Sequence, residues 1–102
     1  MERELTHRVG RGVRISARGR NILDIVVTGI DRIRDRTDLE IRENGHSIHK
    51  VLYHTSPPLE VIEGVVILQT HIPASGSSQR TGRTVYVTYE LGNNYFATPK
   101  KF

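Results

Sequence analysis

The sequence predicts an all-β fold, a small barrel or sandwich of about seven short, mostly antiparallel strands. The apolar residues are mainly Val, Ile and Leu, because the chain has no Trp and only two Phe, and β-branched residues favour strands. Short runs of these residues alternate with polar ones or stop at Gly, Pro and Asn. Helical periodicity is almost absent.

The first two expected strands lie in the N-terminal third of the chain. Arg8 to Ile15 reads as a short strand with a bulge or bend at its glycines. Ser16 to Asn21 is polar and contains Gly, which predicts a turn. Ile22 to Ile30 follows as the second strand, because Ile, Val and Thr dominate it.

A hairpin is expected at Asn44-Gly45. Asp31 to Asp38 alternates charges and fits a turn or a single helical turn, after which Leu39 and Ile41 alternate with charged residues as in a half-buried strand. Asn-Gly between two alternating segments is a strong signal for a two-residue turn. Ser47 to Tyr53 is therefore expected to return antiparallel as the next strand.

The second half of the chain is expected to add strands around one loop. Leu59 to Ile72 fits one long bent strand or two short ones. Pro73 to Arg83 is small and polar and reads as a mobile loop. Thr84 to Leu91 alternates apolar and polar residues and leads through a turn into a closing strand, Tyr95 to Thr98. Residues 99–102 read as a short basic tail.

The length of 102 residues fits a single β-rich domain over residues 1–102. The chain has no Cys, which excludes disulfides and thiolate metal sites and favours a reducing compartment. Its first residues lack the apolar run of a signal peptide, and the longest apolar stretch, Val65 to Leu68, is too short to cross a bilayer. We therefore expect the protein to be cytoplasmic, with the cytoplasm of a host cell or a virion as alternatives. We expect no membrane partner.

Arginine is concentrated near the start of the chain. Six arginines and a single carboxylate, Glu4, lie between Arg3 and Arg20, which gives this segment a net charge of about +5. The whole chain carries +4, with a second basic region in residues 71–102. A guanidinium can form two parallel hydrogen bonds to a phosphate or stack on a base. The sequence therefore predicts a partner that is RNA or another polyanion.

The candidate nucleic-acid contacts come from this arginine patch, from the expected loop and from one strand. Arg80 and Arg83 are candidates for a second anion contact. Tyr86 lies opposite the apolar face of its strand, where it can stack on a base. The alternative interpretation is a solvated strand face with an unliganded tyrosine. The patch residues are Arg8, Arg11, Arg14, Arg18 and Arg20.

The segment Leu5-Thr6-His7-Arg8-Val9-Gly10-Arg11-Gly12-Val13-Arg14-Ile15 resembles the first strand of the carbon storage regulator family of bacterial RNA-binding proteins. Ile25 to Ile30 is similar to that family's second strand, and Ser56 to Val61 to its Ala-Pro-Lys-Glu-Val segment. The resemblance implies an interlocked homodimer that binds GGA-bearing RNA hairpins and regulates translation, with Leu5, Thr6, His7 and Arg8 near the RNA. His7 and Arg11 depart from the Arg and Glu of that pattern, and its Val-His-Arg-Glu-Glu segment has no match after Val61.

No catalytic, metal or cofactor site is predicted. His46 and His49 are two of five histidines and can meet across a turn, but their spacing matches no zinc signature. Ser47, His49 and Asp38 do not form a triad by order alone, and no nucleophile elbow or phosphate-cradling loop is present. We therefore expect a protein that is not an enzyme.

Two other functions fit the same composition. A structural or assembly protein, such as a viral coat-stabilising or connector subunit, would bind neighbouring subunits through its strand edges, loop and basic tail. An inhibitor would bind an acidic patch on its partner. An open edge strand also predicts a homodimer, whereas an edge capped by the Pro-rich segment or the tail predicts none.

Overall fold

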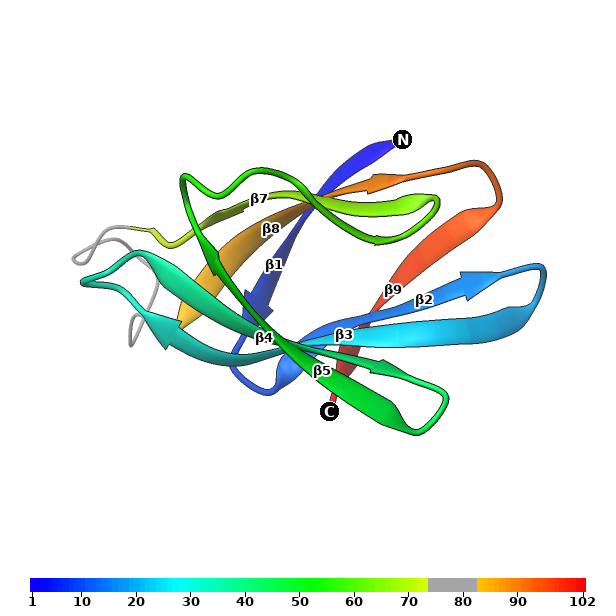
Figure 1. Cartoon of the computed structure of the whole chain (residues 1–102), viewed down its shortest axis with the longest axis horizontal. Helices are drawn as coiled ribbons and strands as arrows, with labels where there is room; N and C mark the ends of the chain where they lie inside the picture. Colours follow the sequence, from blue (N-terminus) through cyan, green and yellow to red (C-terminus); the bar gives the residue numbers. More distant parts are fainter. Residues whose placement is uncertain (74–82) are drawn as a thin grey trace.

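The computed structural model describes residues 1–73 and 83–102, and the regular structure of these residues is entirely β-strand (Figure 1). The first five strands are β1 (Glu2–Arg8), β2 (Arg11–Ala17), β3 (Arg20–Asp31), β4 (Arg36–Glu43) and β5 (His46–Tyr53). The others are β6 (Leu59–Ile62), β7 (Val65–His71), β8 (Thr84–Leu91) and β9 (Tyr95–Lys101). The all-β prediction is confirmed.

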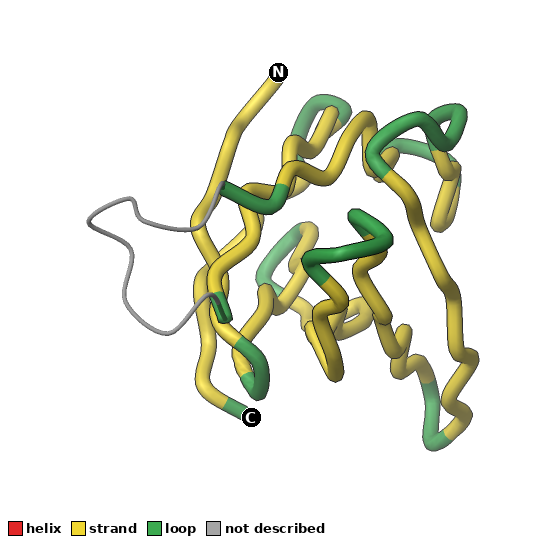
Figure 2. The backbone as a smooth tube through the Cα atoms, turned by 90° about the vertical axis from the view of Figure 1, so that its left-hand side faces the viewer, coloured by secondary structure: helices red, strands yellow, loops and turns green. Residues whose placement is uncertain are grey.

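The strands form two antiparallel sheets arranged as a sandwich. The four-stranded sheet has the order β1-β8-β7-β6, and the five-stranded sheet has the order β5-β4-β3-β2-β9. In Figure 1, β1, β7 and β8 lie together in the upper half, and β2 to β5 lie below them. Figure 2 shows the same chain turned by 90°, with strands joined by loops. Of the two predicted architectures, the structure shows the sandwich.

The core lies between the two sheets and is built mainly from Val, Ile and Leu. Side chains alternate between the faces of a strand, so β8 directs its odd-numbered residues inward. The core residues of β8 are Val85, Val87, Tyr89 and Leu91. The five-stranded sheet contributes Val13, Ile15, Leu23, Ile25, Val27, Leu39, Ile41, Leu52 and Ala97.

The turn between β4 and β5 is the predicted Asn-Gly hairpin. Asn44 and Gly45 both have positive φ, 52° and 78°, as a type I′ turn requires. The two strands then pair without interruption from Arg36 with Tyr53 to the turn itself. The predicted hairpin with its antiparallel return strand is therefore confirmed.

The prediction of a single strand over Arg8 to Ile15 is wrong, because the chain turns after β1 and enters the other sheet. Gly10 has a φ of 89°, which favours glycine, and its N–H donates to the Val27 carbonyl oxygen at 2.8 Å. β1, which begins at Glu2, lies almost entirely before the predicted segment. The segment that resembles the first strand of the regulator family is thus divided between two strands.

The residues expected to form a basic tail instead form the end of β9. Residues 99–101 pair with residues 11–13 of β2. Pro99 lacks an N–H, and an edge strand such as β9 tolerates this. The Phe102 N–H continues the arrangement by donating to the Gly10 carbonyl oxygen at 2.8 Å.

The strand count exceeds the predicted seven for two reasons. β1 was not predicted as a separate strand, and Leu59 to Ile72 divides into β6 and β7 at a turn where Gly64 has a φ of 95°. The expected loop between Pro73 and Arg83, with Arg80, lies outside the described residues. Among the residues that are described, no helix is long and apolar enough to cross a membrane.

Candidate nucleic-acid interface

Antiparallel pairing of β2 with β9 brings the two basic regions of the sequence together. Arg11 lies directly opposite Lys101, and Gly12 lies opposite Lys100. Directly opposite residues of antiparallel strands have Cα atoms about 4.5–5.5 Å apart. The β1–β2 turn and the C-terminus accordingly lie on the same, lower side of the molecule in Figure 1.

Two further cations lie at the same end of the sandwich. Arg8 is the last residue of β1 and pairs with Thr84, the first residue of β8. Arg83 precedes Thr84 directly in the chain, so its backbone lies beside this pair. We refer to the resulting group of five exposed cations as the basic end: Arg8, Arg11, Arg83, Lys100 and Lys101.

The cations of the basic end form no ion pair with a carboxylate of residues 1–73 or 83–102. Several other arginines do form such pairs, namely Arg14, Arg34, Arg36 and Arg42. Exposed cations of one sign raise the local concentration of anions. The basic end is therefore a part of the described surface that suits a polyanion.

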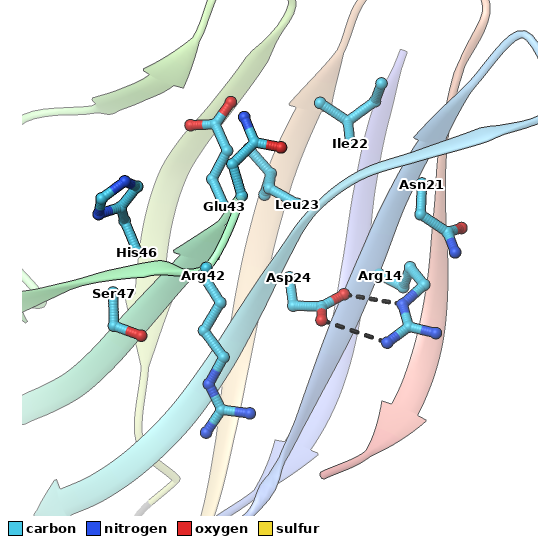
Figure 3. Close-up of a pocket in the computed structure, with 11 residues that line it drawn as sticks. Arg14, Asn21, Ile22, Leu23, Asp24, Arg42, Glu43, His46 and Ser47 are labelled. Carbon is cyan, nitrogen blue, oxygen red and sulfur yellow. Dashed lines mark hydrogen bonds and ion pairs between the residues drawn. The ribbon is translucent and has the colours of Figure 1, made fainter.

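Arg14 belongs to a different surface. It lies on the outer face of the five-stranded sheet, where its Nε donates to Asp24 Oδ1 at 2.9 Å and its Nη2 to Asp24 Oδ2 at 3.2 Å (Figure 3). This forked pair raises the pKa of Arg14 through the hydrogen bonds and the charge of Asp24. The hollow beside it, about 370 Å³, is lined by both charge signs, including Arg42 and Glu43.

Arg18 and Arg20 lie at the opposite end of β2, in the turn between β2 and β3 and at the start of β3. β2 has seven residues, so its ends are about 20 Å apart at about 3.3 Å per residue. Together with Asn93, Asn94 and Tyr95, these arginines line a hollow of about 420 Å³. The structure therefore does not bring the five arginines of the predicted patch together.

The four residues that the family resemblance places near RNA point in different directions. Thr6 and Arg8 are exposed, whereas Leu5 packs against the core. His7 is only 2% exposed, and its Nε2 lies 3.0 Å from the Tyr89 hydroxyl oxygen. Burial lowers the pKa of His7 to about 4, so its ring is neutral at pH 7.

Tyr86 lies on the outer face of the four-stranded sheet, as alternation along its strand predicted. Its ring stacks on His71, with centroids 6.1 Å apart and an angle of 13° between the rings. His54 extends this arrangement, with its centroid 5.5 Å from that of His71. We refer to His54, His71 and Tyr86 as the aromatic row. Sequence reasoning missed both histidines, because a bulge in β7 sets which residues face Tyr86.

The aromatic row adjoins the basic end. Thr6 of β1 lies directly opposite Tyr86, and Arg8 follows Thr6 on the same face of the strand. At the other end of this sheet, Glu2 lies opposite Glu90. The outer face is thus acidic at one end and basic and aromatic at the other.

The described residues contain no group of three or more His, Cys, Asp or Glu side chains that could hold a metal ion. His46 and His49 are both exposed on β5. No protein-family model matches the chain, and comparisons with curated proteins and with solved structures give no match.

Proposed function

We propose that the protein binds single-stranded nucleic acid, RNA foremost, with its basic end on the phosphate backbone. One observation carries this proposal: cations from both ends of the sequence meet at one end of the sandwich and have no carboxylate partner among the described residues. Each phosphate that a cation neutralises releases condensed counterions, which favours binding. Arg8 and Arg11 can also form forked hydrogen bonds to phosphate oxygens.

The aromatic row gives bases a place beside these phosphate contacts. His71 is exposed and Tyr86 half-buried on the face that Arg8 shares. Stacking of a base on an aromatic ring contributes about 1–3 kcal/mol and tolerates any base. A duplex keeps its bases paired and stacked, so this surface favours a single strand. The protein acts on a transcript by occupying it, as a post-transcriptional regulator does.

Two matched double variants test the proposal. Arg8→Gln with Arg11→Gln removes two charges from the basic end, and Arg18→Gln with Arg20→Gln removes two charges from the opposite end of β2. We expect the first variant to weaken binding of fluorescent single-stranded RNA by about tenfold, equivalent to about 1.4 kcal/mol. The second should stay within about twofold of the wild type. Equal losses in both variants would contradict a localised site.

A structural or assembly function is the second candidate, and the edge strand β5 favours it. Seven of its eight residues are exposed, and Ile48 and Val51 retain 55% and 48% of their accessible surface. The outer edge of β5 is unpaired in the described chain. Such an edge can pair with a strand of another molecule.

A further inference from the structure

A small pocket lies within the basic end, where the edge of the four-stranded sheet meets β2 and β9. Its volume is about 130 Å³. At about 30 Å³ per molecule of liquid water, this is room for about four waters. The lining residues are Thr6, His7, Arg11, Gly12, Pro99, Lys100 and Lys101.

The hydrogen bond between His7 and Tyr89 determines which nitrogen of His7 carries the proton. Tyr89 is fully buried, and His7 Nε2 is the hydrogen-bond partner of its hydroxyl in the described part of the chain. Burial raises the pKa of Tyr89, so the hydroxyl keeps its proton. A buried hydroxyl without an acceptor is unfavourable, so Tyr89 donates to Nε2. The neutral ring of His7 therefore carries its own proton on Nδ1.

That Nδ1–H group is available to a ligand. It has no hydrogen-bond partner among residues 1–73 and 83–102. The fully buried side-chain atoms that lack a partner in this part of the chain belong to other residues, so Nδ1 is not fully buried. Nδ1 therefore keeps access to solvent, and His7 lines the pocket. The pocket thus combines a ring N–H donor with the cations of Arg11 and Lys101, which lie on the same face of the paired strands β2 and β9, and no carboxylate lines it.

We propose that this pocket binds a terminal phosphate of a nucleic-acid strand, with His7 Nδ1–H and the cations of Arg11 and Lys101 around the phosphate oxygens. The volume is sufficient for a phosphate group. A phosphate monoester carries a charge of about −1.5 to −2 at pH 7 and three acceptor oxygens. An internal phosphodiester carries one charge and two free oxygens, so the cluster of cations favours the monoester. This inference rests on the proposed function for the source of the phosphate.

Nitrogen-15 NMR of the histidine rings tests the pocket directly. Inorganic phosphate is titrated first, followed by single-stranded RNA of one sequence with a 5′-phosphate, a 3′-phosphate or neither. We expect phosphate to shift the His7 Nδ1 signal while the signals of the exposed His46 and His49 stay in place. A phosphorylated end should strengthen RNA binding by about tenfold over the unphosphorylated strand.

Matched variants distinguish phosphate binding in the pocket from a general effect of positive charge. Arg11→Gln with Lys101→Gln should abolish the His7 shift, and Arg18→Gln with Arg20→Gln should preserve it. If phosphate leaves the His7 signal unchanged, the proposed phosphate site in the pocket is overturned, even if RNA still binds elsewhere on the basic end. A His7 shift with phosphate but no RNA binding supports the pocket and overturns the proposed function. Equal affinity for all three RNAs overturns the assignment to a strand end.

Discussion

Nε2 of His7 on β1 lies 3.0 Å from the hydroxyl oxygen of Tyr89 on the neighbouring strand β8, inside the core. The two rings meet edge to face, with centroids 6.0 Å apart and an angle of 69° between them. Both residues are at most 2% exposed. Each thus satisfies a polar group of the other that is removed from water.

Replacing Tyr89 with Phe should destabilise the protein by about 1–3 kcal/mol, because Nε2 of His7 loses its partner while remaining buried. Urea denaturation followed by circular dichroism measures this. Tyr95→Phe is the matched control, since the Tyr95 hydroxyl forms no hydrogen bond with the described residues; its change should stay within about 0.5 kcal/mol. Equal effects of the two substitutions would rule out a stabilising role for the His7–Tyr89 bond.

Stability should fall as the pH falls from about 6.5 towards 4. Burial lowers the pKa of His7 in the folded protein from 6.5 to about 4, so between these values the unfolded chain binds more protons. The contribution of His7 is therefore complete above pH 6.5, and up to roughly 3 kcal/mol is lost by pH 4. Urea titrations across this range should show a shallower slope for His7→Gln. An unchanged slope in that variant would assign the pH dependence to other groups.

The sequence was sufficient to predict those elements whose signals are local. The turn at Asn44-Gly45 and the alternation along Thr84 to Leu91 both depend on neighbouring residues. The position of Arg11 opposite Lys101 could not be predicted, because it depends on pairing between strands from distant parts of the chain. Sheet register also decides that Arg14 meets Asp24, and no local pattern encodes it.

Gly10 illustrates the same limit for backbone conformation. A glycine within a strand-like segment predicts a bulge, a bend or a turn. Only packing of the two sheets selects the turn that separates β1 from β2. The predicted arginine patch was split for this reason, since Arg8 and Arg14 lie in different sheets.

Gly12 should tolerate no side chain. A Cβ atom at this position would overlap the carbonyl oxygen of Ile25 on the adjacent strand, and backbone cannot move aside as a flexible side chain can. We expect Gly12→Ala to cost several kcal/mol, about 3 or more, as measured by thermal denaturation. At Gly29 a Cβ would lie 3.0 Å from Oδ2 of the Asp38 side chain, so Gly29→Ala should cost clearly less. If Gly12→Ala lowered the stability only slightly, this result would contradict the close approach of β2 to β3.

Self-association through β5 is tested by placing a lysine on its exposed face. Sedimentation velocity should show concentration-dependent association of the wild type, and Val51→Lys should weaken it, because a charged edge resists strand pairing. Thr98→Lys is the control on β9, the opposite edge of the same sheet, and it should leave the association unchanged. A wild type that stays monomeric at all concentrations, or equal loss in both variants, would remove β5 as the contact.

The salt dependence of RNA affinity tests the role of the basic end most directly. For a single strand, log K falls with log salt by about 0.7 per phosphate contacted. If all five cations of the basic end contact phosphate, the slope should be about −3.5 for the wild type, and about 1.4 shallower for Arg8→Gln with Arg11→Gln. Identical slopes for the two proteins, or an affinity independent of salt, would show that these cations do not bind the phosphate backbone.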